Sequence, residues 1–271
     1  MVSILGCGWL GLPLAQSFIA EGIKIKGSTT KPQKLDILSA NKIDPYLIQL
    51  ADIRHNSNLD NFLSSKLLII NVPPSRDFNT VDDYLKSLTL LNQYIENSAV
   101  KNLIFISSTS VYSYAVQEID ENGAIEESGL GQKLFLAEQI FRTNKHLNTT
   151  VIRMAGLFGP NRLPGRFFAG KASVANGLAP VNMIHLDDCV AIIKKVVALE
   201  YWNQTINACT PHHPSRKEFY TEAIRLYGGT IPEFVEENGQ YKLISPKKLI
   251  TELDYRFIHA DLIHSLSSLA H

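Results

Sequence analysis

Short apolar segments rich in branched side chains alternate along the chain with segments of helical period. The strand-like segments are residues 2–5, 23–26, 46–50, 67–72, 103–106 and 149–154. Such an alternation is typical of βαβ units, in which helices cover both faces of a parallel sheet. The pattern therefore predicts an α/β fold with a doubly wound parallel sheet of about six or more strands.

The helices between these strands are predicted from apolar residues spaced three and four positions apart. The first helix runs from about Leu10 to Ala20 and ends before Gly22. The later periodic sets are Tyr84, Leu85, Leu88, Leu91 and Ile95, and then Leu134, Ala137 and Phe141. Closer to the C-terminus, Ser215 and Glu218 form a capping-box pattern, and Ser245-Pro246 predicts a cap followed by proline in the first turn.

A glycine-rich turn follows the first strand and opens the first helix. Its residues, Gly6-Cys7-Gly8-Trp9-Leu10-Gly11, form a GxGxxG pattern in the context that a dinucleotide-binding loop requires. We expect Gly6 to make the turn, Gly8 to let a pyrophosphate approach the backbone, and Gly11 to permit close packing of helix against strand. The alternative is a glycine-rich turn without a ligand, but the flanking strand and helix favour a bound dinucleotide.

The end of the second strand indicates which dinucleotide is bound. An NAD-selective site presents Asp or Glu there to the ribose hydroxyls, whereas this chain has Gly27-Ser28-Thr29-Thr30-Lys31. The hydroxyls of Ser28, Thr29 and Thr30 and the charge of Lys31 suit a 2′-phosphate, so NADP is favoured over NAD. A solvated loop residue is the alternative interpretation of Lys31.

Further positions at strand ends are expected to contact the cofactor. Asp52 and Ile53 follow the third strand, where a side chain can receive the adenine amino group, although Asp52 also suits an ordinary turn. Pro73 and Ser107 lie at the ends of the fourth and fifth strands. Ligands of doubly wound folds bind at these carboxyl ends of the strands.

Composition changes this picture by excluding other classes of protein. The chain has 271 residues, 45% of them hydrophobic, and its 26 basic residues balance 26 acidic ones. With this balance the chain has no excess of positive charge to attract nucleic acid or an anionic membrane, so a small molecule is the expected partner. Because no signal-peptide pattern precedes the first strand and no apolar run reaches about 20 residues, we expect a soluble, cytoplasmic protein. Cys7, Cys189 and Cys209 lack disulfide or metal spacing and are expected to be buried free thiols.

The composition of the sequence and the length of its predicted elements change after the sixth predicted strand. Glycine, proline and arginine cluster in residues 156–170, and the later segments are shorter. We therefore expect residues 1–154 to form the NAD(P)-binding Rossmann domain. Residues 155–271 are then a smaller substrate-binding region, partly interleaved with the Rossmann core.

Several motifs together resemble the short-chain dehydrogenase/reductase superfamily, in its extended NAD-dependent epimerase/dehydratase branch. Besides the glycine loop, the segments that carry the resemblance are residues 105–112, 151–160 and 184–188. The resemblance covers nearly the whole chain and implies a Rossmann fold, NAD(P) binding and an oxidoreductase or epimerase-like activity, although a fold alone does not define a reaction. Residues 8–11, 107–112 and 164–171 are also similar to the atypical, YeeZ-like bacterial proteins of that superfamily.

The helix after the fifth strand departs from that family. The family carries a tyrosine there, which exchanges a proton with the substrate, and four residues later a lysine, which holds the nicotinamide ribose. Alignment on residues 136–138 places Leu130 and Leu134 at those positions, and neither side chain can carry a proton. Lys133 is one residue away, but the residue four before it is Gly129. The usual Tyr-x-x-x-Lys pair is therefore absent.

Ser108 and Tyr112 are the remaining catalytic candidates. Ser108 falls on the family's active-site serine, and the resemblance implies that it hydrogen-bonds a substrate hydroxyl or carbonyl; the alternative is a hydroxyl that caps the strand end. Tyr112 belongs to a Val-Tyr pair whose tyrosine usually packs structurally, although Tyr112 or Tyr114 is also a candidate phenol for a rearranged site. Water or a substrate acid can also supply the proton, since hydride transfer belongs chiefly to the cofactor.

Arg153, Arg162 and Arg166 fall within fourteen residues of one another. Forked guanidinium groups suit phosphate or carboxylate recognition, and the family resemblance makes the ligand a nucleotide sugar or another anionic metabolite. Arg153 better fits an ion pair with a neighbouring acid that braces the sheet. Arg162 and Arg166 are therefore the candidate substrate-binding residues.

Histidine and aspartate residues near the predicted helix starts fit structural roles. His185, Asp187 and Asp188 suggest a metal site at first sight, but next to a helix start they are expected to cap the helix and favour its dipole. His212-His213 lies before Pro214 and is expected to belong to a loop. No metal site is predicted.

Two functional hypotheses follow from the sequence. The leading one is an NADP-linked oxidoreductase or epimerase-like enzyme that acts on an anionic small molecule. The alternative is a catalytically silent protein that senses NADP(H) or binds a partner, and Leu130 and Leu134 support it. Ser108 and the arginine pair favour the enzyme, because a pure sensor needs no pocket for a substrate anion. A scaffold without ligand has only the superfamily's helix-mediated dimers as precedent, and a homodimer is compatible with either main hypothesis.

Overall fold

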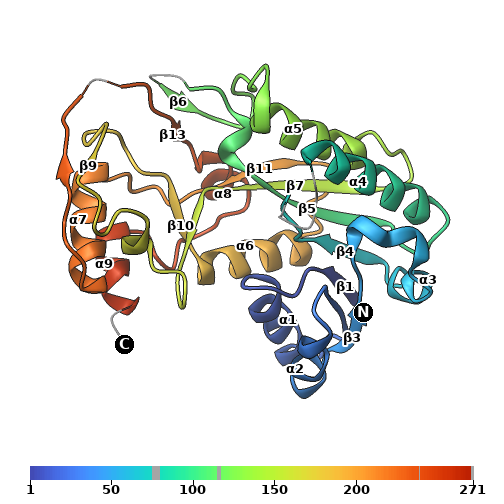
Figure 1. Ribbon diagram of the computed structural model, residues 1–271. Helices are drawn as coiled ribbons and strands as arrows, with labels where there is room; N and C mark the ends of the chain where they lie inside the picture. The colour runs from blue at the N-terminus through green and yellow to red at the C-terminus, as the bar shows by residue number, and fades with distance from the viewer. Residues whose placement is uncertain (75–79, 115–116, 238, 270–271) are drawn as a thin grey trace. The chain divides into compact units, whose positions relative to one another are not determined.

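The computed structural model describes residues 1–74, 80–114, 117–237 and 239–269 (Figure 1). Its main sheet has seven strands in the order β11-β7-β5-β4-β1-β2-β3. These strands are β1 (Val2–Leu5), β2 (Ile25–Thr29), β3 (Asp44–Leu47), β4 (Leu67–Ile70), β5 (Asn102–Ser108), β7 (Asn148–Met154) and β11 (Thr205–Ala208). From β3 to β5 all neighbouring strands pair in parallel. This is a doubly wound parallel sheet of the Rossmann type, which confirms the predicted fold class.

The chain divides into two compact units, and each unit consists of three segments that are separate in the sequence. The first unit comprises Met1–Val111, Ile125–Arg153 and Val196–Thr205. The second unit comprises Tyr112–Ala124, Met154–Lys195 and Ile206–His271. Among the described residues, no helix has both the length and the apolar character needed to cross a membrane.

The first unit contains the helices of the N-terminal half of the fold. They are α1 (Gly11–Ala20), α2 (Leu35–Ala40), α3 (Leu59–Phe62), α4 (Val81–Glu96) and α5 (Gly129–Arg142). Helix α4 begins where the Thr80 side chain accepts the Asp83 N–H, and it buries the apolar face that its periodicity predicts. Helices α4 and α5 pack together (Figure 1). A core of strand and helix side chains, including Leu68, Leu88 and Phe105, lies between these helices and the sheet.

The second strand extends further than its apolar residues suggest. The predicted strand covers residues 23–26, whereas β2 runs from Ile25 to Thr29 and so includes Gly27 and Ser28. Small residues are required there, because a Cβ added at Gly27 would lie 2.5 Å from Ile43 Cγ2 and 2.7 Å from Cys7 Sγ. The hydroxyl-rich segment that resembles a loop in the sequence is therefore partly a buried strand.

The third and fourth strands are also displaced from their predicted limits. Strand β3 begins at Asp44 and ends at Leu47, and Leu50 already starts a short 3-10 helix, Leu50–His55. Pro45 lies inside β3, which is possible because β3 is an edge strand of the sheet. Strand β4 ends at Ile70, two residues before the predicted end at residue 72.

Short strand pairs and four α-helices make up the regular structure of the second unit where its residues are described. The strand pairs are β6 (Glu118–Ile119) with β13 (Leu243–Ile244), β8 (Gly156–Phe158) with β10 (Met183–His185), and β9 (Ser173–Val174) with β12 (Glu233–Phe234). The helices are α6 (Leu186–Ala198), which starts in this unit, α7 (Arg216–Tyr227), α8 (Lys247–Glu252) and α9 (Leu262–Leu266). The unit has its own core, in which Phe158, Phe219 and Leu262 are fully buried. All three cysteines are free and buried, as predicted.

The two predicted helix caps of this unit differ in outcome. The Ser215 side chain accepts the Glu218 N–H and the Glu218 side chain accepts the Ser215 N–H, so the capping box at the start of α7 is confirmed. At α8 the prediction is wrong by one residue, since Pro246 occupies the N-cap position and the helix starts at Lys247. Proline fits there because its missing N–H is not needed at a helix start.

Candidate functional site

The turn after β1 contains three glycines with different surroundings. Gly6 has φ of +101°, and a Cβ added to it would lie 2.6 Å from the carbonyl oxygen of Asn71. A Cβ added at Gly11 would lie 2.2 Å from the carbonyl oxygen of Gly6. Among the described residues, nothing lies within 4 Å of a Cβ added at Gly8. Backbone geometry therefore requires Gly6 and Gly11, whereas Gly8 faces open space that a ligand can approach.

Two side chains from neighbouring strands hold this turn in place. The Gly6 N–H donates to Ser28 Oγ at 2.9 Å, and Asn71 Nδ2 donates to the Gly6 carbonyl oxygen at 3.1 Å. Ser28 lies near the end of β2 and Asn71 directly after β4, and these are the two strands on either side of β1. Asn71 was not among the predicted residues. Its signal in the sequence is a polar side chain directly after a buried strand.

Helix α1 starts directly after this turn without a side-chain cap. Leu10 is its N-cap residue and makes no side-chain cap bond, and the first turn has no acidic residue. The Leu12 N–H donates to the Gly8 carbonyl oxygen and Pro13 has no N–H, so the N–H groups left to a ligand are those before Leu12. Leu10 itself is buried, and Trp9 is half-buried. Uncapped N–H groups at a helix start carry partial positive charge and bind phosphate. The start of α1 is therefore suited to an anion.

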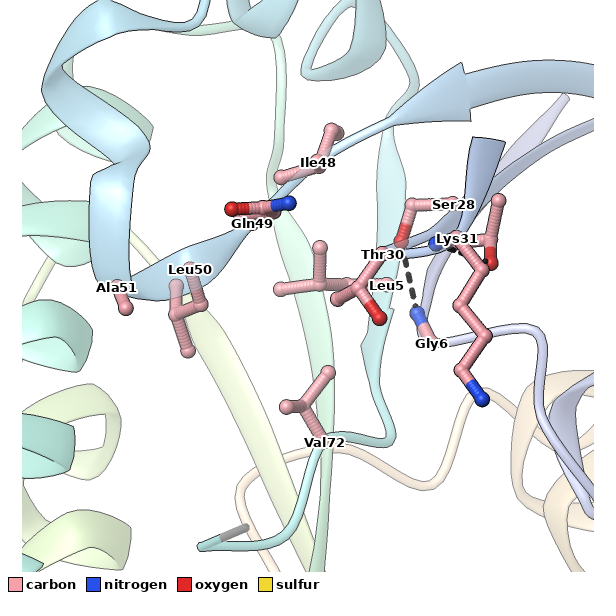
Figure 2. Close-up of a pocket in the computed structure, with 11 residues that line it drawn as sticks. Leu5, Gly6, Ser28, Thr30, Lys31, Ile48, Gln49, Leu50, Ala51 and Val72 are labelled. Carbon is pink, nitrogen blue, oxygen red and sulfur yellow. Dashed lines mark hydrogen bonds between the residues drawn. The ribbon is translucent and has the colours of Figure 1, made fainter. Parts of the chain in front are cut away.

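A cavity of about 360 Å³ lies at the carboxyl ends of these strands (Figure 2). Its lining residues come from four strand ends of the first unit: Leu5, Gly6, Ser28, Thr29, Thr30, Lys31, Ile48, Gln49, Leu50, Ala51 and Val72. Figure 2 shows the hydrogen bond between Gly6 and Ser28 in the wall of this cavity. The volume is in the range of small-molecule sites, and the place is where ligands bind in doubly wound folds.

The residues at the end of β2 divide into two kinds. Ser28 and Thr29 are only 2% and 7% exposed. The Ser28 hydroxyl is bonded to the glycine turn, and Thr29 Oγ1 accepts the Lys31 N–H at 3.2 Å. Thr30 and Lys31 are exposed at the cavity. The groups available to a phosphate here are therefore the Thr30 hydroxyl and the Lys31 ammonium, while Ser28 supports the turn.

The predicted contacts after β3 and β4 lie beside the cavity lining rather than in it. Asp52 is exposed, with Oδ1 2.7 Å from His55 Nδ1, and Ile53 is buried in the core. The residues that line the cavity from this segment are its predecessors, residues 48–51. Pro73 is exposed, and its neighbour Val72 provides the lining.

Ser107 belongs to a buried polar network of the first unit. Its hydroxyl donates to Glu138 Oε1 at 2.6 Å, and Arg153 Nη2 contacts Glu138 Oε2 at 2.7 Å. The side chains of Arg153 and Glu138 are 2% and 0% exposed. Arg153 thus makes the bracing ion pair that its position suggests. The network joins the end of β5 to α5 and β7.

Ser108 and α5 form the part of the fold where the family carries its proton-transfer groups. The Ser108 hydroxyl donates to Ser110 Oγ at 3.0 Å and accepts the Ser110 N–H at 3.1 Å, so it caps the strand end. On α5, Leu130 is exposed and Leu134 is buried. Lys133 Nζ lies 2.7 Å from Asp82 Oδ1 on α4, which holds it in an ion pair. No ionisable group replaces the family's pair at these α5 positions.

Tyr112 and the two candidate arginines belong to the second unit. Tyr112 is fully buried and its hydroxyl donates to Asn207 Oδ1 at 2.7 Å, which supports the packing role. Arg162 and Arg166 are exposed. Arg162 Nε donates to the Leu157 carbonyl oxygen at 3.0 Å, and the Arg166 guanidinium lies 5.7 Å from the ring centroid of Tyr227. These contacts orient both guanidinium groups at the surface of this unit.

At the start of α6, the residues that were predicted to cap the helix have different roles. His185 Nδ1 accepts the Asp187 N–H at 3.2 Å, so His185 does cap the helix. Asp188 has another role: it is fully buried and accepts the Tyr255 hydroxyl and the N–H groups of Ile258 and His259. Burial and the neighbouring His259 lower the pKa of His185. Asp188 therefore anchors the segment between α8 and α9.

The doubly wound sheet, the glycine turn and the cavity at the strand ends define a Rossmann-fold protein. No protein-family model matches the chain. It is 32% identical to the protein YeeZ of Escherichia coli K12 over 267 residues, which cover 96% of both chains. The chain therefore belongs to the YeeZ family.

Solved structures show the same fold at low sequence identity. A short-chain dehydrogenase/reductase superfamily protein from Agrobacterium tumefaciens with bound NAD has a TM-score of 0.80 at 14% identity, over 100% of this chain and 96% of that one. The human epimerase family protein SDR39U1 with NADPH has a TM-score of 0.76 at 16% identity, over 100% and 99%. MoeE5 in complex with UDP-glucose and NAD has a TM-score of 0.79 at 16% identity, over 99% and 97%.

Proposed function

We propose that the first unit binds NADP(H) and that the protein is an oxidoreductase or epimerase-like enzyme acting on an anionic small molecule such as a nucleotide sugar. The observation that carries this proposal is the cavity at the strand ends, with the glycine turn in its wall and Thr30 and Lys31 exposed at it. The open backbone at Gly8, next to the start of α1, supports a pyrophosphate there. Lys31 and Thr30 offer charge and a hydroxyl to a 2′-phosphate.

The preference for NADP over NAD rests on the chemistry at the end of β2. The residues exposed there are a threonine and a lysine, and no described carboxylate lines the cavity. A carboxylate is the group that an NAD site places on the ribose hydroxyls. The related folds contain both cofactors, since SDR39U1 holds NADPH and MoeE5 holds NAD. The proposed preference for NADP over NAD therefore rests on the cavity residues of this chain.

In this proposal the protein side chains position the substrate and the cofactor, and no tyrosine hydroxyl transfers a proton. NADP(H), when bound, supplies hydride transfer. We assign substrate binding to the half-exposed Ser108 hydroxyl, which exchanges its bonds to Ser110 for a bond to a substrate hydroxyl or carbonyl. The buried pair of Glu138 and Arg153 holds the strand on which Ser108 lies. Because Leu130 and Leu134 replace the tyrosine and lysine, water or a substrate acid provides the proton.

The substrate anion is assigned to Arg162 and Arg166 of the region 155–271, while residues 1–154 provide the cofactor site. Guanidinium groups bind phosphate and carboxylate through paired hydrogen bonds. Both arginines are exposed. MoeE5, which has this fold, binds UDP-glucose. A nucleotide sugar is therefore the first substrate class to test.

The cofactor proposal is tested by titrating the protein with NADPH and NADH and following cofactor fluorescence. Gly8→Asp should abolish binding of both, because it places a carboxylate against the pyrophosphate. Lys31→Glu should weaken NADPH binding about tenfold or more and leave NADH binding unchanged. Lys34→Glu is the matched control, since Lys34 is an exposed lysine three residues away and does not line the cavity. NADPH binding that survives Gly8→Asp would contradict the proposal.

The second candidate function is a sensor of NADP(H) without turnover. Leu130 and Leu134 favour it, because neither can carry or stabilise a proton. Adding a panel of nucleotide sugars to the NADPH complex separates the two functions. Loss of the reduced-cofactor signal supports the enzyme, and Arg166→Ala should then reduce turnover without weakening NADPH binding. A partner whose affinity depends on NADPH, together with no turnover, supports the sensor.

A further inference from the structure

Three potential metal ligands meet in the second unit from parts of the chain far apart in sequence. His185 ends β10, Asp187 lies in the first turn of α6, and His259 lies between α8 and α9. His185 Nδ1 lies 3.3 Å and His259 Nε2 lies 3.0 Å from the same oxygen of Asp187, Oδ2. One ligand atom of each residue lies within 4.8 Å of the other two. The group combines two imidazoles with a carboxylate.

The position of His259 in this group is fixed by the backbone. Asp188, fully buried, accepts the N–H of Ile258 at 2.8 Å through Oδ1 and the N–H of His259 at 3.0 Å through Oδ2. The Tyr255 hydroxyl donates to the same carboxylate at 2.7 Å. These three bonds hold the segment against the start of α6. The two histidines therefore remain together, with ring centroids 3.7 Å apart.

The His185 ring has hydrogen-bonding capacity that the described protein groups do not use. The side chain is 3% exposed, and its Nε2 is buried without a hydrogen-bond partner among the described residues. Its Nδ1 accepts only a bond of 3.2 Å from the Asp187 N–H. A ring nitrogen that accepts an N–H carries a lone pair, so the Nδ1 atom beside Asp187 is in the form that a metal ligand must have.

The two separations measured from Asp187 Oδ2 agree with a tetrahedral first-row metal, and the two ring nitrogens lie within 4.8 Å of each other. Ligand atoms at about 2.0–2.1 Å from Zn²⁺ lie roughly 3.3 Å from one another when the geometry is tetrahedral. The two observed separations from Asp187 Oδ2 are 3.3 Å and 3.0 Å. Imidazole and carboxylate together suit Zn²⁺ better than Mg²⁺ or Ca²⁺, which prefer oxygen ligands alone. The Asp187 side chain is 55% exposed, which gives an ion a path from solvent.

We propose that His185, Asp187 and His259 form a binding site for one Zn²⁺ ion, with water at the remaining position. The two rings are tilted by 38° to each other, and each places one nitrogen within 3.3 Å of Asp187 Oδ2. The ion joins the end of β10 and the start of α6 to the C-terminal segment. It thereby stabilises the second unit, and this role is independent of the cofactor proposed for the first unit.

The test uses tag-free protein stripped of metal with a chelator. One equivalent of Zn²⁺ should raise the melting temperature by about 2–4 °C, and excess chelator should reverse the shift. Co²⁺, as a spectroscopic substitute, should give the visible absorption bands of a four-coordinate N/O site. Asp187→Asn and His259→Gln should each abolish the bands and weaken Zn²⁺ binding more than about 100-fold, because loss of even an outer-shell partner costs 10–100-fold.

The matched control is His212→Gln. His212 Nδ1 lies 3.3 Å from Asp261 Oδ1 and is also a partly exposed histidine beside an aspartate, but it does not belong to the three-ligand group. It should keep both the Co²⁺ bands and the thermal shift. Circular dichroism of the metal-free variants shows whether each is folded, and the exposed Asp187→Asn carries the test if His259→Gln is not. Equal Zn²⁺ stabilisation of the wild type and Asp187→Asn, or the absence of Co²⁺ bands in the wild type, would overturn the proposal.

Discussion

Gly8 and Gly11 lie three residues apart, but only Gly11 has backbone atoms in the space that a side chain would occupy. A Cβ at Gly11 would meet the Gly6 carbonyl oxygen at 2.2 Å, while a Cβ at Gly8 would meet no described atom within 4 Å. Gly11→Ala should therefore lower the free energy of unfolding by about 1–3 kcal/mol. Gly8→Ala should change it by less than about 1 kcal/mol. Urea denaturation of the two variants measures both values, and equal losses would show that the turn is not packed as described.

Single residues also show why a site cannot be taken directly from a motif. Ser28 has the side-chain chemistry to hold a phosphate, and its position at a strand end suggests that role. Its hydroxyl is instead 2.9 Å from the Gly6 nitrogen and almost without exposure. Thr30, two residues later, has the same chemistry and is exposed. The two hydroxyls differ in burial because Ser28 lies inside β2 and Thr30 directly follows its end.

At the scale of the element, α5 carries one buried and one exposed ion pair. Glu138 pairs with Arg153 without solvent exposure, whereas Lys133 and Asp82 are 33% and 59% exposed. Glu138→Gln should lower the free energy of unfolding by about 3–5 kcal/mol, because it leaves the Arg153 charge buried without a counter-charge. Lys133→Met, on the same helix, should cost less than about 1 kcal/mol. Chemical denaturation compares the two, and a small effect of Glu138→Gln would mean that water reaches Arg153.

The strands illustrate which elements a hydrophobic pattern detects. Strands β1 and β4 are continuous apolar runs and begin where they are predicted. Strand β2 begins two residues later and runs through Gly27 and Ser28, and edge strand β3 contains Pro45. The pattern fails at these two because their residues are selected by close packing and by an edge position. Neither property is visible from local hydrophobicity.

At the scale of the whole molecule, acid should weaken the fold through His213. Burial lowers its pKa below the ordinary value of 6.5, and the adjacent His212 adds to this effect. The Val181 carbonyl oxygen, 3.1 Å from Nδ1, and Glu118 raise the pKa and oppose it only in part. Below pH 6.5 the unfolded chain therefore takes up a proton that the folded chain does not. The stability that the neutral ring provides is complete above that pH and is lost as the pH falls toward the folded-state pKa.

The His213→Asn variant measures this contribution. When the pH is lowered from about 7 to about 5, this variant should lose less stability than the wild type, because asparagine does not titrate in that range. His146→Asn, which makes the same substitution at an exposed histidine of the first unit, is the matched control. Unfolding in urea at several pH values provides the comparison. Parallel profiles for the wild type and His213→Asn would contradict the assignment.

The sequence by itself determined the local features: the order of strands and helices, the glycine turn and the capping box at Ser215. These follow from residues that are neighbours along the chain, where periodicity and backbone conformation set the structure. Only the tertiary structure decided that Asn71 holds the glycine turn and that His259 meets His185. Such meetings depend on which strands lie side by side and on how distant segments pack, and no local pattern records them.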